Sequence, residues 1–152
     1  MRRAPLALLI LVAVLTAGCT RGPDEPAKRP PLTGAAAEQE DRRLESELGK
    51  IPGVRSAKVL HVSETFQVGN SVSAEITSGA SSSKDVDAVT EAALRILWNT
   101  RLFTPGVVNL TVTGSAPAGG QDLRRLGFGS QGFALGSELG SRFGKPQFES
   151  NP

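Results

Sequence analysis

Two residue types that often carry chemistry occur only once each in this 152-residue chain, as Cys19 and His61. A single Cys cannot form an intramolecular disulfide, and one Cys with one His cannot supply a cysteine-rich or multi-histidine metal site. His61 is the only side chain whose ordinary pKa lies near neutrality. Acyl-transfer catalysis would need a nucleophile and an orienting acid beside it, and only Ser63 and Glu64 lie close in sequence, without a surrounding motif. We therefore predict no catalytic and no metal-binding residues.

A second pattern has the spacing of a cofactor loop. Gly127, Gly129 and Gly132 match the glycine spacing of dinucleotide-binding loops. That mechanism requires a strand before the glycines, a helix after them and an acid about 20 residues further on. Here a Pro/Gly/Ala spacer comes before and more Gly-rich sequence follows, so no cofactor is expected. Asp85 and Asp87 do not form an acid pair either, because they lie about 200° apart on a helix.

The surroundings of Cys19 are more informative. Arg2 and Arg3 precede an uncharged, apolar stretch over residues 4–18 that ends in small residues. A basic start, a short apolar run and small residues are typical of a secretory signal peptide. A membrane-spanning helix needs about 20 apolar residues, so a permanent transmembrane segment is not predicted.

The end of this stretch, Leu15-Thr16-Ala17-Gly18-Cys19, resembles the lipobox of bacterial lipoproteins. The resemblance implies that residues 1–18 are a signal peptide, that lipid is attached to the sulfur of Cys19, and that the chain is cleaved just before this residue. Thr16 departs from the Leu that is commonest at its position. A chain anchored in this way would lie on the extracytoplasmic face of the cell membrane.

Cleavage before Cys19 would also change the charge. The full chain has 17 basic and 15 acidic residues, a formal net charge of +2 and a pI of about 9.0. Removal of Arg2 and Arg3 with the signal peptide leaves equal numbers of basic and acidic residues. Nucleic-acid binding depends on clustered Lys and Arg, and the remaining sequence has only short basic pairs. No nucleic-acid partner is predicted.

The remaining chain divides into three segments. Residues 19–37 contain four prolines and few large apolar side chains, which predicts a Pro-rich tether. Residues 38–113 carry helical and alternating apolar patterns, which predicts a small domain. Residues 114–152 are rich in Gly and Phe and are predicted to be a tail. Within this tail, residues 123–126 have the pattern of a helical turn and residues 137–143 that of a short helix.

The domain is predicted to have the order helix, strand, strand, helix, strand. Both faces of the strand at residues 54–62 are fairly apolar, as in a central strand, with Ala57, Val59 and His61 on one face. The second strand alternates cleanly and leaves one face polar. Two helices on a three-stranded sheet would form an α+β two-layer sandwich. The elements are expected at residues 38–50, 54–62, 71–77, 83–99 and 107–113.

This order resembles, in topology only, the ring-building domains of secretion-system lipoproteins and of sporulation and flagellar ring proteins. The whole layout also resembles uncharacterised small lipoproteins of high-GC Gram-positive bacteria, a resemblance that implies no activity. We expect a non-catalytic interaction domain with an envelope protein as its partner. One alternative is a small-ligand binding module with a pocket lined by Trp98, Phe128 or Phe133, and a less favoured one is an accessory hydrolase using His61.

Overall fold

The structure is a computed structural model that describes residues 27–65, 69–115, 121–128 and 132–150. The predicted signal peptide, the lipobox and Cys19 lie outside the described residues. Side chains are described for residues 30–62, 69–115, 121–128 and 132–148.

A mixed four-stranded sheet, with the strand order β2-β3-β4-β5, forms the centre of the domain. β2 and β3 are antiparallel, β3 and β4 are parallel, and β4 and β5 are antiparallel. A separate parallel pair joins β1 to β6. In chain order the elements are β1 (Ala27–Arg29), α1 (Gly34–Leu48), β2 (Val54–Thr65), β3 (Gly69–Ser78), α2 (Ser83–Trp98), β4 (Val107–Thr113), β5 (Ala134–Leu135), α3 (Gly136–Phe143) and β6 (Phe148–Ser150).

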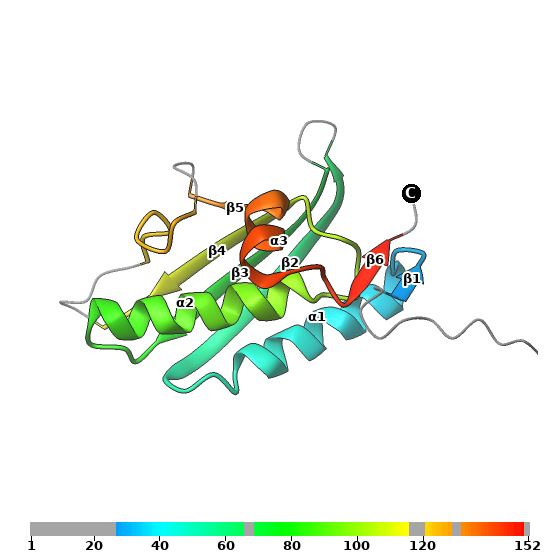
Figure 1. Ribbon diagram of the computed structural model, residues 1–152. Coiled ribbons are helices and arrows are strands. Elements are labelled where there is room, and N and C mark those ends of the chain that lie inside the picture. The colour runs from blue at the N-terminus through cyan, green and yellow to red at the C-terminus, as the bar shows by residue number, and fades with distance from the viewer. Residues whose placement is uncertain (1–26, 66–68, 116–120, 129–131, 151–152) are drawn as a thin grey trace, which may run out of the picture.

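The helices cover one face of the sheet, as Figure 1 shows, and the core lies between the two layers. α2 forms at nearly the bounds expected from the sequence. Ser82 caps it by accepting a hydrogen bond from the backbone N–H of Asp85 at 3.1 Å, and Asn99 ends it. Such a cap satisfies a donor that the first helical turn leaves free. The face of α2 toward the sheet is buried at Val86, Val89, Thr90, Ala93, Leu94, Leu97 and Trp98.

The predicted α+β class is confirmed, but the predicted counts of helices and strands are wrong. The described chain has three helices, and its main sheet has four strands. The additional elements come from the segment predicted to be a tail, where Leu123, Phe128 and Leu139 are buried in the core. Gly136 permits the start of α3 to approach the turn before β4 closely, since a Cβ at this position would lie 2.5 Å from the carbonyl oxygen of Pro105. The short helix predicted at residues 137–143 is present as α3.

The domain also begins earlier than predicted. α1 starts at Gly34 rather than at residue 38, and β1 lies within the segment predicted to be a tether. The backbone N–H of Leu32 donates to the carbonyl oxygen of Leu102 at 3.0 Å. The prolines at 30 and 31 do not prevent this arrangement because they fall between β1 and α1. A strand of three residues whose partner lies more than 100 residues away leaves no periodic signal in the sequence.

The position of the first long strand differs from its prediction. β2 is an edge strand, although its two apolar faces suggested a central one. One face, with Val59, packs under α1, whereas Leu60 and Val62 on the other face are 64% and 41% exposed. The apolar character of the outer face therefore does not come from burial within the domain.

Candidate functional site

The predicted candidate residue His61 lies on the helix-covered face of β2 and bonds to α1. Its Nδ1 is 2.7 Å from Oδ2 of Asp41, and the two side chains are 25% and 19% exposed. The His61 ring also lies near Phe103, with 6.5 Å between ring centroids. Asp41 was not singled out from the sequence, because the two residues are 20 positions apart in different elements. Asp41 lies three and seven residues before the buried Leu44 and Leu48, at the spacing of one helix face, and this is the signal that could have indicated it.

Burial raises the pKa of Asp41 above its ordinary value. The hydrogen bond and the charge of His61 act in the opposite direction, while neighbouring Glu45 and Glu40 add to the increase. The second carboxylate oxygen, Oδ1, is buried without a hydrogen-bond partner among the described residues. Taking a carboxylate out of water disfavours its charged form. The pair is therefore a partly desolvated link between α1 and β2.

The catalytic triad used in acyl transfer consists of a histidine, a carboxylate that orients it and a nucleophile. The Asp41–His61 pair corresponds to the first two. The third part is a nucleophile, and the described hydrogen bond of the His61 ring is made with Asp41 rather than with a hydroxyl or a thiol. Ser63 and Glu64, the neighbours considered from the sequence, have side chains outside this set. The geometry thus supplies a base and its orienting acid but no described nucleophile.

A larger network of charges follows α1 toward its other neighbours. Glu40 is only 4% exposed, and its carboxylate accepts two hydrogen bonds from Arg43 and one from the backbone N–H of Arg101. Arg43 also bonds to Glu47. These bonds to Glu40 raise the pKa of Arg43 above its ordinary value. The spacing of three and four residues along a helix could have indicated this network, but the contact with Arg101 could not be found without the fold.

Glu45, on the same helix, covers the free edge of the sheet. Its Oε1 accepts a hydrogen bond from the backbone N–H of Val59 at 3.0 Å. Because β2 is the edge strand, this N–H has no partner strand, and the carboxylate takes its place. α1 thus closes part of an edge that would otherwise be open to another chain.

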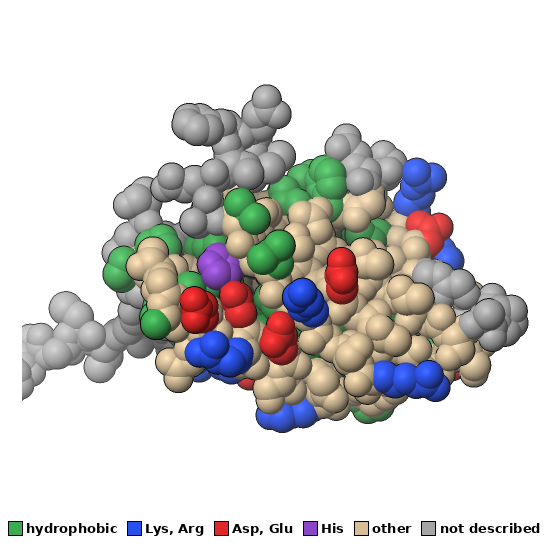
Figure 2. All heavy atoms as spheres, turned by 180° about the vertical axis from the view of Figure 1, so that it is seen from behind, with side chains coloured by type: hydrophobic (Ala, Val, Ile, Leu, Met, Phe, Trp, Pro, Cys, Tyr) green, Lys and Arg blue, Asp and Glu red, His purple; other side chains and the backbone are tan. Residues whose placement is uncertain are grey.

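The uncovered face of the sheet is the second candidate site. Figure 2 shows apolar side chains gathered on one part of the rear of the molecule, with polar surface over much of the rest. Leu60 and Val62 are the exposed large apolar residues of β2. Beside them lies a shallow hollow of about 190 Å³ lined by Lys58, Val59, Leu60, Ser73, Ala74 and Glu75.

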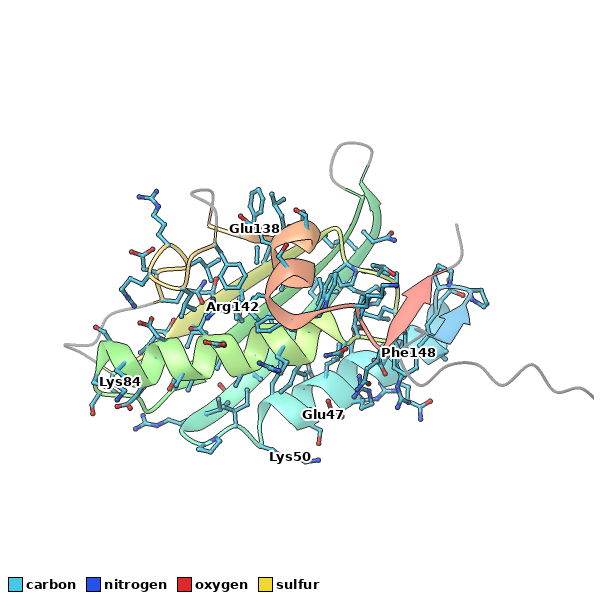
Figure 3. All side chains as sticks on the ribbon, viewed as in Figure 1. Glu47, Lys50, Lys84, Glu138, Arg142 and Phe148 are labelled. Carbon is cyan, nitrogen blue, oxygen red and sulfur yellow. The ribbon has the colours of Figure 1, made fainter. Side chains whose placement is uncertain are left out.

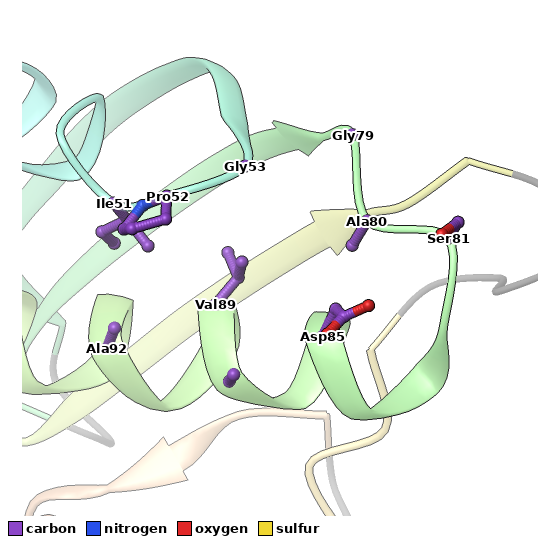
Figure 4. Close-up of a pocket in the computed structure, with 10 residues that line it drawn as sticks. Ile51, Pro52, Gly53, Gly79, Ala80, Ser81, Asp85, Val89 and Ala92 are labelled. Atoms are coloured by element: carbon purple, nitrogen blue, oxygen red, sulfur yellow. The ribbon is translucent and has the colours of Figure 1, made fainter.

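A wider cleft of about 460 Å³ lies at the start of α2. Figure 4 shows Val89 and Ala92 of α2 on one side and Ile51 and Pro52 on the other. Its acid, Asp85, already accepts a hydrogen bond from the hydroxyl of Ser82, and the backbone N–H of Asp85 donates to the same hydroxyl oxygen. Ligand pockets combine apolar walls with several convergent polar groups, and this cleft offers few. It therefore gives little support to a specific small-ligand site.

The aromatic residues expected to line a ligand pocket are placed differently. Trp98 is buried in the core, and its Nε1–H donates to the carbonyl oxygen of Gly144 at 2.9 Å. Phe128 is buried as well, under the guanidinium of Arg142. Phe133 is partly buried. The first two residues serve to fix the C-terminal segment to the domain.

The remaining sequence-based sites cannot be placed. Cys19 lies outside the described residues, as does Gly129 of the glycine pattern. Among the described residues, no group of three or more His, Cys, Asp and Glu side chains could hold a metal ion. No helix in the described part of the chain is long and apolar enough to cross a membrane.

Comparison with known proteins adds no relative. No protein-family model matches the chain, and neither does any curated protein or solved structure.

Proposed function

We propose that this chain is a lipid-anchored protein of the extracytoplasmic face of the cell membrane, and that its domain is a non-catalytic module for contact with an envelope protein. The anchor is supported by the lipobox resemblance at Leu15–Cys19 and by the occurrence of the only Cys at that place. The module is supported by its open sheet face. The exposure of Leu60 at 64% is the single observation that carries this part of the proposal.

The outer face of β2 has the composition of a small contact surface. Leu60 and Val62 are separated by one residue and so lie on the same side of the strand. Polar side chains surround them, including Glu75 and Ser73 on β3, and Asn109 on β4 donates to Ser73 at 3.4 Å. Protein interfaces commonly have an apolar centre within a polar rim. A partner with an apolar side chain at its centre would fit this surface.

The Asp41–His61 pair is assigned a structural role in this proposal. It joins the helix to the edge strand, and both side chains are mostly buried. A bond of this kind holds α1 against β2 without requiring any substrate.

The anchor is tested by labelling with palmitate in cells. Cys19→Ala is expected to abolish incorporation of the label and to shift the protein out of the membrane fraction. Thr16→Leu is the matched control, since it restores the commonest lipobox residue and is expected to keep both the label and the fractionation. Unchanged labelling of Cys19→Ala would refute the anchor.

The contact surface is tested with a photo-crosslinking amino acid at Leu60 in the cells of origin. The protein captured at Leu60 should also be captured by a second crosslinker placed at Lys58. The proposal is supported if this second capture is lost in the Leu60→Asp variant and kept in the Leu135→Asp variant. Leu135 is the matched control because it is 40% exposed but lies on β5 at the opposite edge of the sheet. Equal capture by both variants would mean that the open face is not the contact surface.

The oriented histidine favours one second candidate, an accessory hydrolase using His61. This activity requires a nucleophile near Nε2 and predicts turnover of activated esters or peptides by the purified chain. His61→Asn and Asp41→Asn would then lower kcat by at least about 100-fold. Turnover that neither variant changes would exclude this candidate.

A further inference from the structure

A cleft lined by three arginines lies on the side of the domain where the described chain begins. It encloses about 370 Å³ between α1, the C-terminal end of α2 and the start of β6. We call it the arginine cleft, and its lining residues are Arg43, Glu47, Arg95, Ile96, Asn99, Arg101, Gln147 and Phe148. Figure 3 shows Phe148 and Glu47 on the two sides of this region.

The three arginines differ in how their charge is used. Arg43 is paired with Glu40 and Glu47, so its charge is compensated. Arg95 lies over the ring of Phe143, 4.8 Å from its centroid, and Arg101 lies over Phe148 at 5.4 Å. Neither of these two forms an ion pair with a carboxylate among the described residues. Arg95 and Arg101 are therefore two cations without a carboxylate partner among the described residues, and with the excess negative charge of the Glu40–Arg43–Glu47 group they leave the cleft with a net positive charge of one.

The aromatic contacts leave the donors of both arginines available. An aromatic ring attracts the face of a guanidinium, while the N–H groups lie in the plane at its edge. Such a fork of donors matches the oxygens of a phosphate group. Cation–π contact thus orients Arg95 and Arg101 without consuming the hydrogen bonds that would recognise an anion.

The wall of the cleft is held in place by two hydrogen bonds. Trp98 Nε1–H donates to the carbonyl oxygen of Gly144 at 2.9 Å, and the backbone N–H of Gln147 donates to Oδ1 of Asn99 at 3.0 Å. These bonds fix the segment before β6 against the end of α2. A site whose walls are already fixed loses less conformational entropy when it binds a ligand.

The path of the chain toward Cys19 indicates which anions would lie near the arginine cleft. Ala27 is paired with Phe148 across the β1–β6 ladder, so the chain toward Cys19 leaves the domain beside the arginine cleft. Eight Cα-to-Cα steps separate residues 19 and 27, and even a fully extended chain spans at most about 28 Å over that distance. An anchor at Cys19 would therefore keep this side of the domain close to the membrane surface.

We propose that the arginine cleft binds the phosphate of phospholipid headgroups through Arg95 and Arg101 and so holds the anchored domain against the membrane in one orientation. This inference rests on the proposed anchor at Cys19. With β1, β6 and the cleft turned to the membrane, the far ends of α1 and α2 point away from it, and the open sheet face stands at the side, accessible to a partner.

The test attaches the chain from residue 19 onward to vesicles through a maleimide lipid that reacts with Cys19, the only thiol. One set of vesicles is made of phosphatidylglycerol and phosphatidylcholine, and the other of glycolipids without phosphate. Phenylglyoxal modification of each arginine is followed by mass spectrometry. Arg95 and Arg101 should react at least about fivefold more slowly on the phospholipid vesicles, whereas exposed Arg42 and Arg124 should react equally on both.

Equal rates for Arg95 and Arg101 on the two kinds of vesicle would overturn the proposal. Protection by soluble glycerol phosphate, with none on vesicles, would assign the cleft to a free phosphate ester and would also overturn it. Because the maleimide bond replaces the acyl chain, these results do not depend on acylation of Cys19 in cells. Failure of the proposed anchor, seen by palmitate labelling, is therefore distinguishable from failure of this site.

A second arm uses matched variants of the untethered chain with Cys19→Ser, sedimented with phosphatidylglycerol-containing vesicles at low salt. Arg95→Gln/Arg101→Gln is expected to weaken the partition by about tenfold or more. Lys50→Gln/Lys84→Gln removes the same charge at the far ends of α1 and α2, where Figure 3 places both lysines, and should keep most of the binding. Equal losses in the two variants would indicate unspecific attraction and contradict the cleft.

Discussion

The two long helices cover the same face of the sheet but are held to it by different forces. α2 lies over the central strands and contributes an apolar stripe that includes Val86, Ala93 and Leu97, all fully buried. α1 lies over the edge strand β2 and buries Leu44 and Leu48, yet it also bonds to that strand through Asp41 to His61 and through Glu45 to the backbone N–H of Val59. An edge strand has free backbone donors that apolar side chains cannot satisfy. Polar contacts to a backbone N–H and to His61 thus join α1 to the strand at which the sheet ends.

Substitutions in the apolar contacts of α2 should have the largest effect on the free energy of unfolding. Leu97→Ala leaves a cavity among fully buried neighbours and is expected to lower the free energy of unfolding by about 3 kcal/mol. Leu60→Ala removes the same atoms from a largely exposed position and should change it by less than about 0.5 kcal/mol. Urea denaturation followed by circular dichroism measures both. Similar losses in the two variants would contradict the burial assigned to α2.

The charged network of α1 should come next. Arg43→Met leaves the buried Glu40 carboxylate without its main partner, at an expected loss of about 2 kcal/mol in the free energy of unfolding. Arg42→Met is the control one residue away, because Arg42 is 66% exposed and only 3.9 Å from Glu38. Its loss should stay below about 0.5 kcal/mol. If both variants lose equally, the network is not what holds α1.

The cover over the sheet edge should have a smaller effect. Glu45→Ala removes the acceptor of the Val59 N–H and is expected to lower the free energy of unfolding by about 1 kcal/mol. It also exposes the edge, so self-association at high concentration should rise. Glu38→Ala, which removes an exposed acid from the same helix, should alter neither quantity. Sedimentation velocity together with urea denaturation gives both measurements.

The smallest effect concerns pH. Because burial raises the pKa of Asp41, the folded chain binds a proton at this site more readily than the unfolded chain does. The buried charge of Asp41 therefore lowers the free energy of unfolding at pH values above the pKa of this residue in the folded chain. The loss disappears as the pH falls toward the ordinary pKa of an aspartate. Carbon-13 NMR of the carboxyl carbon should give a titration midpoint above that of the urea-unfolded chain. A midpoint at or below the unfolded value would contradict the desolvation of Asp41.

Local patterns in the sequence predicted much of this fold. The periodicity of α2 and the alternation of β4 are strong, and the structure gives β4 with the bounds expected from the sequence. The helical pattern over residues 38–50 likewise predicts α1, which buries Leu44 and Leu48. These features depend on neighbours in the chain, which is why pattern alone finds them.

The missed features depend on contacts between distant residues. β1 and β6 are separated by more than 100 residues, and each has only three residues. Asp41 meets His61, and Glu40 meets Arg101, only because of the way α1 crosses the edge of the sheet. The outer face of β2 was interpreted as buried because Leu60 and Val62 are apolar. Hydrophobicity alone does not distinguish a core residue from one on an open surface.

If Cys19 is anchored as proposed, the β1–β6 pair would limit how far the domain can move from the membrane. While the pair is formed, the segment between Cys19 and the domain has only the eight Cα-to-Cα steps to Ala27, which is paired with Phe148. Peeling β1 away would free the chain up to Leu32, whose N–H is bonded to Leu102. When fully extended, this linking segment would then span about 45 Å instead of about 28 Å. Opening the three-residue pair between β1 and β6 would thus let an anchored domain move further from the membrane.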